Sequence, residues 1–119
     1  MNEIFVTKAG DGAIVDFVET EILDQVKARA IGLKLRELVA QGDVSNLLID
    51  FRRVKLITSS MIGELLQLRQ KCDEAQVHLK FCSLSSDLTK LLKITKLDKS
   101  FDIYASRDLA VKAFQATKK

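Results

Sequence analysis

The sequence predicts a single-domain α/β fold in which a mixed β-sheet opens with an antiparallel hairpin and is covered by about four helices. Two runs rich in β-branched and aromatic residues flank a glycine-containing turn at residues 10–12, a pattern typical of a hairpin. Segments of helical period then alternate with short apolar strands, which indicates parallel strands joined by right-handed crossovers. The 119 residues include no proline, low-complexity tract or linker, so we expect one domain over residues 1–119.

The hairpin strands are predicted at residues 4–7 and 13–18, and the first helix follows them. Thr20, between two glutamates, offers a hydroxyl that can cap this helix, and the acids suit its first turn. Gly42 is predicted to end the helix, because glycine readily adopts the left-handed conformation found just past many helices. The apolar stripe of this helix consists of Ile31, Leu35, Leu38 and Val39.

Residues 47–51 form an almost unbroken apolar run, as in a buried strand. Asp50, near its end, is either a site acid or, as is commoner for a carboxylate at the end of a strand, an acceptor of backbone N–H bonds. From Met61 to Ala75 the apolar residues recur with the period of a helix. The hydroxyls of residues 58–60 lie between the two patterns and are therefore predicted at a helix N-terminus, beside unpaired N–H groups and the positive end of the dipole.

Three further elements complete the prediction. Residues 77–82 alternate between apolar and polar, which is typical of a half-exposed strand, and Ser85 or Ser86 can cap a short helix after it. A last short strand is expected at residues 101–104, and residues 117–119 are expected to be frayed. Ser106 can cap a terminal helix whose inward residues are predicted to be Leu109, Ala110, Ala113 and Phe114.

The composition argues against several classes of function. A formal charge of +3 without a clustered basic stripe does not favour nucleic acid as a partner. No apolar stretch approaches the ~20 residues that a membrane span needs. The start of the chain lacks the basic and apolar regions of a signal peptide, so we expect a cytoplasmic protein with no membrane association.

The residues that usually carry catalysis or bind metals are sparse. Cys72 and Cys82, with His78 as the one histidine, do not make a zinc site, and both thiols are predicted to be core residues. The sequence has no glycine-rich phosphate loop, paired carboxylates or nucleophile–histidine arrangement. We therefore predict a protein that is not an enzyme and has no metal or cofactor.

The segment LLIDFRRVKLITSSMIG at residues 47–63 resembles the signature of STAS domains, the anti-sigma-factor antagonists. That signature is an apolar strand ending in Asp, a variable turn, and then Asp-Ser-Ser/Thr-Gly-Leu-Gly opening a helix. The likeness continues in residues 79–85 and 91–104 and, less closely, in residues 21–24. Two positions depart from the pattern: Thr58 stands where the family usually has Asp, and Met61 where it usually has Gly.

The resemblance implies a STAS fold and a switch by phosphorylation. In that family the serine after the signature Asp is phosphorylated by a partner that is both an anti-sigma factor and a kinase, and the matching residue here is Ser59. The unphosphorylated antagonist binds that partner and frees a sigma factor, and a phosphatase resets the switch. The alternative within the family is a scaffold that is not phosphorylated and that assembles signalling partners or self-associates; Thr58 and Met61 favour it, because Thr58 removes a carboxylate beside the acceptor.

Six residues beside Ser59 are predicted to contact the partner: Thr58, Ser60, Met61, Ile62, Arg52 and Arg53. The hydroxyls alone need no function, since Ser and Thr are favoured N-caps, but a cap uses one hydroxyl and this segment has three. Met61 and Ile62 form either an exposed apolar patch or part of the core. The neighbouring cations form either a solvated surface, which is the commoner case, or a basic rim that steers an acidic partner; they are Arg52, Arg53, Lys55, Lys90, Lys93, Lys96 and Lys99.

Overall fold

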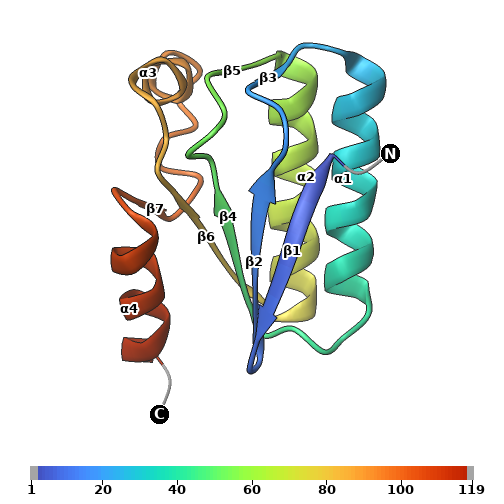
Figure 1. The fold of residues 1–119 in the computed structure, drawn as a ribbon, viewed down its shortest axis with the longest axis vertical. Coiled ribbons are helices and arrows are strands. Elements are labelled where there is room, and N and C mark those ends of the chain that lie inside the picture. The colour runs from blue at the N-terminus through green and yellow to red at the C-terminus, as the bar shows by residue number, and fades with distance from the viewer. Residues whose placement is uncertain (1–2, 118–119) are drawn as a thin grey trace.

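The computed structural model describes residues 3–117 and confirms the predicted mixed α/β architecture (Figure 1). The main sheet has the strand order β1-β2-β4-β6-β7, and all of its pairs are parallel except the β1–β2 hairpin. Its strands are β1 (Ile4–Ala9), β2 (Gly12–Phe17), β4 (Asn46–Asp50), β6 (His78–Cys82) and β7 (Ile103–Tyr104). The helices are α1 (Gln25–Ala40), α2 (Ser59–Ala75), α3 (Ser86–Ile94) and α4 (Arg107–Thr117).

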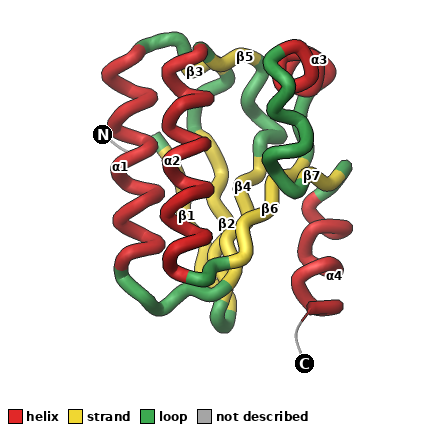
Figure 2. Tube along the Cα trace, turned by 180° about the vertical axis from the view of Figure 1, so that it is seen from behind, coloured by secondary structure: helices red, strands yellow, loops and turns green. Residues whose placement is uncertain are grey.

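The helices divide between the two faces of the sheet (Figures 1 and 2). Both α1 and α2 cover one face, α4 packs against the other, and α3 lies beyond the carboxyl ends of the central strands. Alternation along each strand assigns the side chains to these layers: in β2, Val15 points toward α1 and α2, whereas Ile14 contacts the cluster under α4. The main core therefore lies between the sheet and the α1–α2 pair.

A row of aromatic rings runs through the main core across the strands. The ring of Phe51 has its centroid 5.2 Å from that of Phe17 and 5.1 Å from that of Phe81, and Phe81 stacks on Phe101 at 4.6 Å. Each of these rings lies at or just past the carboxyl end of its strand, or just before β7. The row therefore supports the edge of the sheet from which the loop toward residues 58–60 departs.

The beginning of the first helix differs from the prediction. Asp24 is the N-cap, and its Oδ1 accepts a hydrogen bond of 2.8 Å from the Val26 amide, so the expected cap at Thr20 is wrong. Residues Glu21–Ile22 instead form a short strand, β3, which pairs in parallel with β5 (Leu56–Ile57). A hydrogen bond of 2.7 Å from the Lys55 amide to the Thr20 carbonyl supports this pairing. Neither strand was predicted from the sequence, because a two-residue strand is too short to show an alternating pattern.

Most of the other element ends agree with the sequence. Gly42 has φ +82° just past the end of α1, and Ser85 and Ser106 accept hydrogen bonds from the amides of Leu88 and Leu109, as helix caps do. Leu109 is half exposed and not inward, because α4 turns Ala110 and Phe114 toward the sheet. Residues 118 and 119 of the predicted frayed end lie outside the described residues.

The cysteines are buried and free, on α2 and β6, consistent with the prediction that they pack in the core. Burial raises the pKa of Cys72 to about 12 and that of Cys82 to about 11, so both thiols stay protonated at neutral pH. Within residues 3–117, no helix combines the length and the apolar character that a membrane crossing requires.

Close packing between α1 and α2 depends on Gly32. The Glu64 side chain lies against this glycine, so that an added Cβ would be 1.9 Å from Glu64 Oε1 and 2.9 Å from its Cβ. The same Oε1 accepts a hydrogen bond of 2.6 Å from Arg36 Nη1. Gly32→Ala is therefore expected to displace Glu64 and to lower the free energy of unfolding by about 1–3 kcal/mol, despite the better helix propensity of alanine.

Gly63 offers a matched control for this prediction, because it also lies inside a helix but has open space around its Cα. Gly63→Ala is expected to raise the free energy of unfolding by up to about 1 kcal/mol. Urea denaturation of both variants measures the difference. An equal gain in the two variants would show that Glu64 yields without cost.

Candidate functional site

The predicted hydroxyl cluster stands where β5 leads into α2. Thr58 is the N-cap residue of α2, and Ser59 is the first helical residue and is exposed, whereas Ser60 is half-buried. The short β3–β5 pair holds this junction, because the Thr58 amide donates a hydrogen bond of 3.2 Å to the Ile22 carbonyl. The Ser59 hydroxyl is thus available to another protein at a fixed position.

The N-terminus of α2 has no side-chain cap. Thr58 has the extended backbone of an N-cap, with φ −95° and ψ 171°, but its hydroxyl makes no capping bond. That Oγ1 atom is buried and has no hydrogen-bond partner among the described residues. The amides of the first turn are therefore not satisfied by Thr58, and the positive end of the dipole beside Ser59 favours an anionic group there.

The predicted contact residues divide between surface and core. Arg52 and Arg53 are exposed in the turn after β4, as a contact surface requires. Met61 and Ile62 are buried, with exposed fractions of 0% and 6%, and both belong to the main core. Of the two alternatives for these residues, the structure confirms core packing and excludes an exposed apolar patch beside Ser59, because the first turn of α2 directs both side chains toward the sheet and α1.

Three exposed apolar residues that the sequence did not single out lie at this end of the molecule. Leu23 directly follows β3, Leu56 belongs to β5, and Val26 lies in the first turn of α1, whose N-terminus is at the same end as that of α2 (Figure 1). Their exposed fractions are 55%, 43% and 76%. Exposed apolar residues gathered in one region are typical of protein-binding surfaces. Only the β3–β5 pairing brings Leu23 and Leu56 together, so no sequence pattern indicated them.

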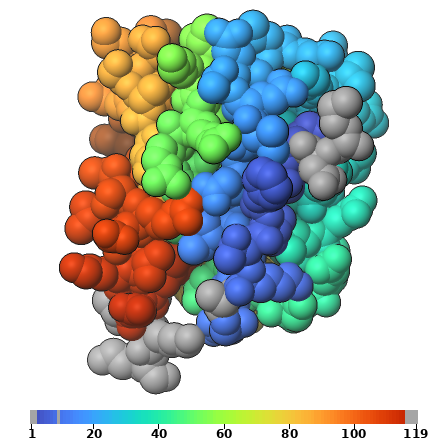
Figure 3. All heavy atoms as spheres, viewed as in Figure 1, coloured from blue at the N-terminus to red at the C-terminus, as the bar shows by residue number. Residues whose placement is uncertain are grey.

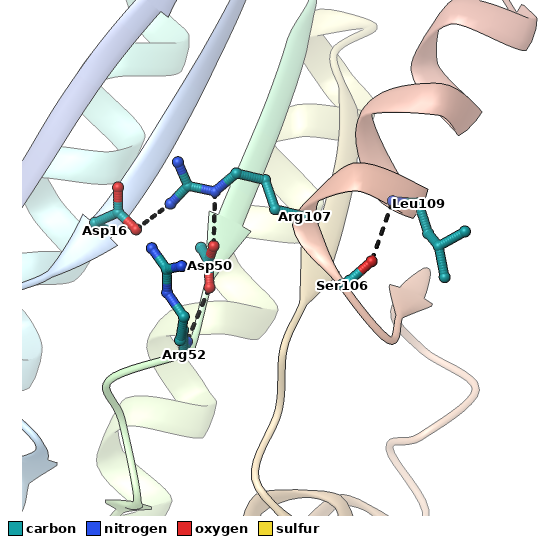
Figure 4. Close-up of polar contacts among 6 residues, drawn as sticks. All are labelled: Asp16, Asp50, Arg52, Ser106, Arg107 and Leu109. Carbon is teal, nitrogen blue, oxygen red and sulfur yellow. Dashed lines mark hydrogen bonds and ion pairs between the residues drawn. The ribbon is translucent and has the colours of Figure 1, made fainter.

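Asp50 anchors the turn that leads from β4 toward Ser59 (Figure 4). Its Oδ1 accepts a hydrogen bond of 2.9 Å from the Arg52 amide, which confirms the predicted role of a strand-end carboxylate. Its Oδ2 accepts a hydrogen bond of 2.8 Å from Arg107 Nε, and Arg107 Nη2 also donates to Asp16 Oδ1 at 2.5 Å. Arg107 comes from α4, and no sequence pattern indicated this ion cluster.

The register of the sheet explains why the cluster needs an arginine. Asp16 of β2 pairs directly with Asp50 of β4, so two carboxylates are neighbours on the same face. Arg107 forms an ion pair with each carboxylate, so its one positive charge offsets their mutual repulsion. Desolvation acts to lower the pKa of Arg107, but the hydrogen bond to Asp50 and the charges of both carboxylates outweigh it and raise that pKa.

Two groups that are common in catalytic sites, a histidine and a cluster of metal ligands, are not found beside Ser59 among the described residues. His78 lies at the amino end of β6, whereas Ser59 lies beyond the carboxyl ends of the strands, so the two residues are at opposite ends of the sheet (Figure 1). Among residues 3–117, no group of three or more His, Cys, Asp or Glu side chains is placed to hold a metal ion. The site offers an exposed hydroxyl, a helix N-terminus and a partly apolar surface.

Comparisons with known proteins agree with this fold. The model of the STAS domain family matches residues 6–110, and no curated protein matches the chain. The unphosphorylated form of the anti-sigma factor antagonist SpoIIAA has a TM-score of 0.80 at 15% identity, over 98% of this chain and 99% of that one.

Two further solved structures have TM-scores of 0.82 at 23% identity over 94% of this chain. They are an anti-sigma factor antagonist from Mycobacterium paratuberculosis and an anti-sigma-factor antagonist (STAS) domain protein from Planctomyces limnophilus, covered over 92% and 97% of their lengths. At these identities the structural matches establish the fold alone.

Proposed function

Because the chain belongs to the STAS domain family, we propose that it is a cytoplasmic anti-sigma-factor antagonist that binds an anti-sigma factor and is switched by phosphorylation of Ser59. The partner is itself the serine kinase, a phosphatase removes the phosphate, and the chain acts as a substrate and binding module without catalysis of its own. The observation that carries the proposal is the exposed Ser59 hydroxyl at the start of α2, at the residue that the resemblance matches to the family's phosphorylated serine.

The surroundings of Ser59 support a switch that acts on binding and not on folding. A phosphate adds about −1.5 to −2 charges at neutral pH. The uncapped N-terminus of α2 favours negative charge, so the domain keeps its fold. The new bulk and charge lie at the same end of the molecule as the exposed apolar residues Leu23, Val26 and Leu56, where a docked partner meets them. Phosphorylation therefore weakens the complex.

Intact-mass analysis identifies the residue that accepts the phosphate. The tagged protein is captured from an extract of its native cells, and its intact mass is compared with that of Ser59→Ala and Ser60→Ala variants handled in the same way. We expect a phosphorylated fraction in the wild type and in Ser60→Ala, but none in Ser59→Ala. Phosphate that persists in Ser59→Ala would move the acceptor elsewhere.

A second prediction concerns the binding step. Ser59→Asp is expected to weaken binding of the recovered partner at least tenfold while the melting temperature shifts by no more than about 2 °C, because an acid at the first helical position is tolerated. Ser59→Asn is the matched control, since it has nearly the same size without the charge. Titration calorimetry and thermal unfolding on the same samples measure both effects; equal affinity of Ser59→Asp and Ser59→Asn would contradict a switch by charge.

One observation favours the alternative of a scaffold that is not phosphorylated. Thr58 lacks the carboxylate that the family usually places beside the acceptor serine, and its hydroxyl is buried. If the protein is a scaffold, Ser59→Asp binds the partner as well as the wild type does, and intact-mass analysis finds no phosphate. Sedimentation then tests whether the scaffold self-associates.

A further inference from the structure

Two basic segments that are distant in the sequence lie side by side near β5. The turn after β4 contains Arg52, Arg53 and Lys55. The second segment, α3, lies about thirty residues further along the chain, directly after β6. The Ser85 hydroxyl at the start of α3 donates a hydrogen bond of 3.5 Å to the Lys55 carbonyl, and α3 packs beside β5. In Figure 3 the segment after β4, in green, adjoins α3, in orange, on one face of the molecule. We call this the basic face and define it as residues 52–57 and 86–99.

The positive charge of this face is not neutralised within the protein. Residues 3–117 contain ten lysines and arginines that make no ion pair, and three of them are scattered: Arg29, Lys71 and Lys112. The other seven are all on the basic face: Arg52, Arg53, Lys55, Lys90, Lys93, Lys96 and Lys99. Only two acids, Asp87 and Asp98, belong to the same segments. Unpaired cations are therefore concentrated on one side of the molecule.

The same face carries exposed apolar side chains and no aromatic ring. Ile94, at the end of α3, is 77% exposed between Lys93 and Lys96, and Leu56 is 43% exposed next to Lys55. The buried residues of α3, Leu88 and Leu92, face the interior, so Ile94 is not needed for packing. Nucleic-acid surfaces that bind single strands usually stack bases on aromatic rings, and residues 52–57 and 86–99 contain none.

We propose that the basic face is a docking surface for an acidic segment of another protein, and that an apolar side chain of this segment packs against Ile94. Opposite charge accelerates the encounter, and the apolar contact gives the complex its lifetime. The proposal specifies the chemistry of a partner. It does not rest on phosphorylation of Ser59, so it can fail or succeed independently of the proposed switch.

The test uses unmodified protein and two labelled probes, followed by fluorescence anisotropy at low ionic strength. The first probe is a glutamate-rich peptide with interspersed leucines, and the second is a single-stranded oligonucleotide of equal charge. Arg52→Glu/Arg53→Glu and Lys90→Glu/Lys93→Glu are each expected to weaken peptide binding about tenfold or more. The control Arg29→Glu/Lys112→Glu changes the net charge equally at exposed positions outside the face, and its affinity is expected to stay within about twofold of the wild type.

A separate variant tests the apolar contact at Ile94. Ile94→Ala is expected to bind the leucine-containing peptide several-fold more weakly than the wild type, and to bind a leucine-free peptide of the same charge as the wild type does. Lys93 lies in the last turn of α3, where a glutamate is unfavourable beside the negative end of the helix dipole. If thermal unfolding shows that Lys90→Glu/Lys93→Glu disturbs α3, the neutral variant Lys90→Gln/Lys93→Gln replaces it. Equal losses in the control variant would overturn the proposal, because net charge alone would then explain binding. Tighter binding of the oligonucleotide through the same residues would also overturn it and would identify a nucleic-acid surface.

Discussion

Arg107→Met is expected to lower the free energy of unfolding by about 3 kcal/mol, toward the lower end of the range for breaking a buried ion pair. Without Arg107, the carboxylates of Asp16 and Asp50 face each other in register with no counter-charge. Only 1% of the Asp50 side chain is exposed, whereas Asp16 and Arg107 are about one third exposed, so solvent relieves part of the cost. Methionine keeps most of the aliphatic packing of the arginine, so the loss reports mainly on charge.

A double variant separates repulsion from packing. Asp50→Asn/Arg107→Met is expected to be more stable than Arg107→Met alone. The side-chain oxygen of the asparagine can still accept the hydrogen bond from the Arg52 amide, and the buried negative charge at position 50 is gone. Lys8→Met serves as the control: it removes the exposed ion pair with Asp43, and the unfolding midpoint is expected to stay nearly unchanged. Urea denaturation measures all three. Wild-type stability of Arg107→Met would mean that apolar contacts alone hold α4 on the sheet.

Phe51→Ala is expected to cost about 3–5 kcal/mol, the usual range for removing a buried phenylalanine. Phe51 is 2% exposed and lies between the rings of Phe17 and Phe81 at 5.2 and 5.1 Å, so its removal leaves a cavity in the middle of the aromatic row. Its carbonyl also accepts a hydrogen bond from the Val54 amide, at the start of the turn toward Ser59. We therefore expect the loss of stability to be accompanied by weaker partner binding.

Phe5→Ala provides the matched control for this loss, because Phe5 is 59% exposed on the edge strand β1. Its unfolding free energy is expected to change by less than about 1 kcal/mol. Denaturant titrations on both variants give the comparison. Similar losses for Phe51 and Phe5 would contradict the assignment of the aromatic row to the core.

Lys80 shows where periodicity misleads. The alternating pattern of β6 predicts that Lys80 faces solvent, but it is 7% exposed because α4 covers that face of the sheet. Its Nζ donates to Asp102 Oδ2 at 2.5 Å and lies 5.0 Å from the ring centroid of Tyr104. Desolvation acts to lower the pKa of Lys80, but the hydrogen bonds to Asp102 and Tyr104 outweigh it and raise that pKa, so the buried amine stays charged.

Local patterns alone determined a large part of this protein. The change from an apolar run to a helical period placed the hydroxyls of residues 58–60 at the start of α2, and the strand-end position of Asp50 predicted its bond to the following turn. These features depend on a few consecutive residues, whose spacing and hydrogen-bonding groups are visible in the chain. The order of the longer elements, and a sheet that opens with an antiparallel hairpin, followed from the same periodicities, whereas the strand order and the β3–β5 pair did not.

Tertiary structure decided which distant segments meet. It paired β3 with β5, brought Arg107 to Asp16 and Asp50, turned Met61 into the core, and set α3 beside the turn after β4. Periodicity tells which side of an element is apolar, but it does not tell what covers that side, and a two-residue strand has no period to detect. Ion pairs between segments far apart in the chain depend on the final positions of both segments, so only the folded protein shows them.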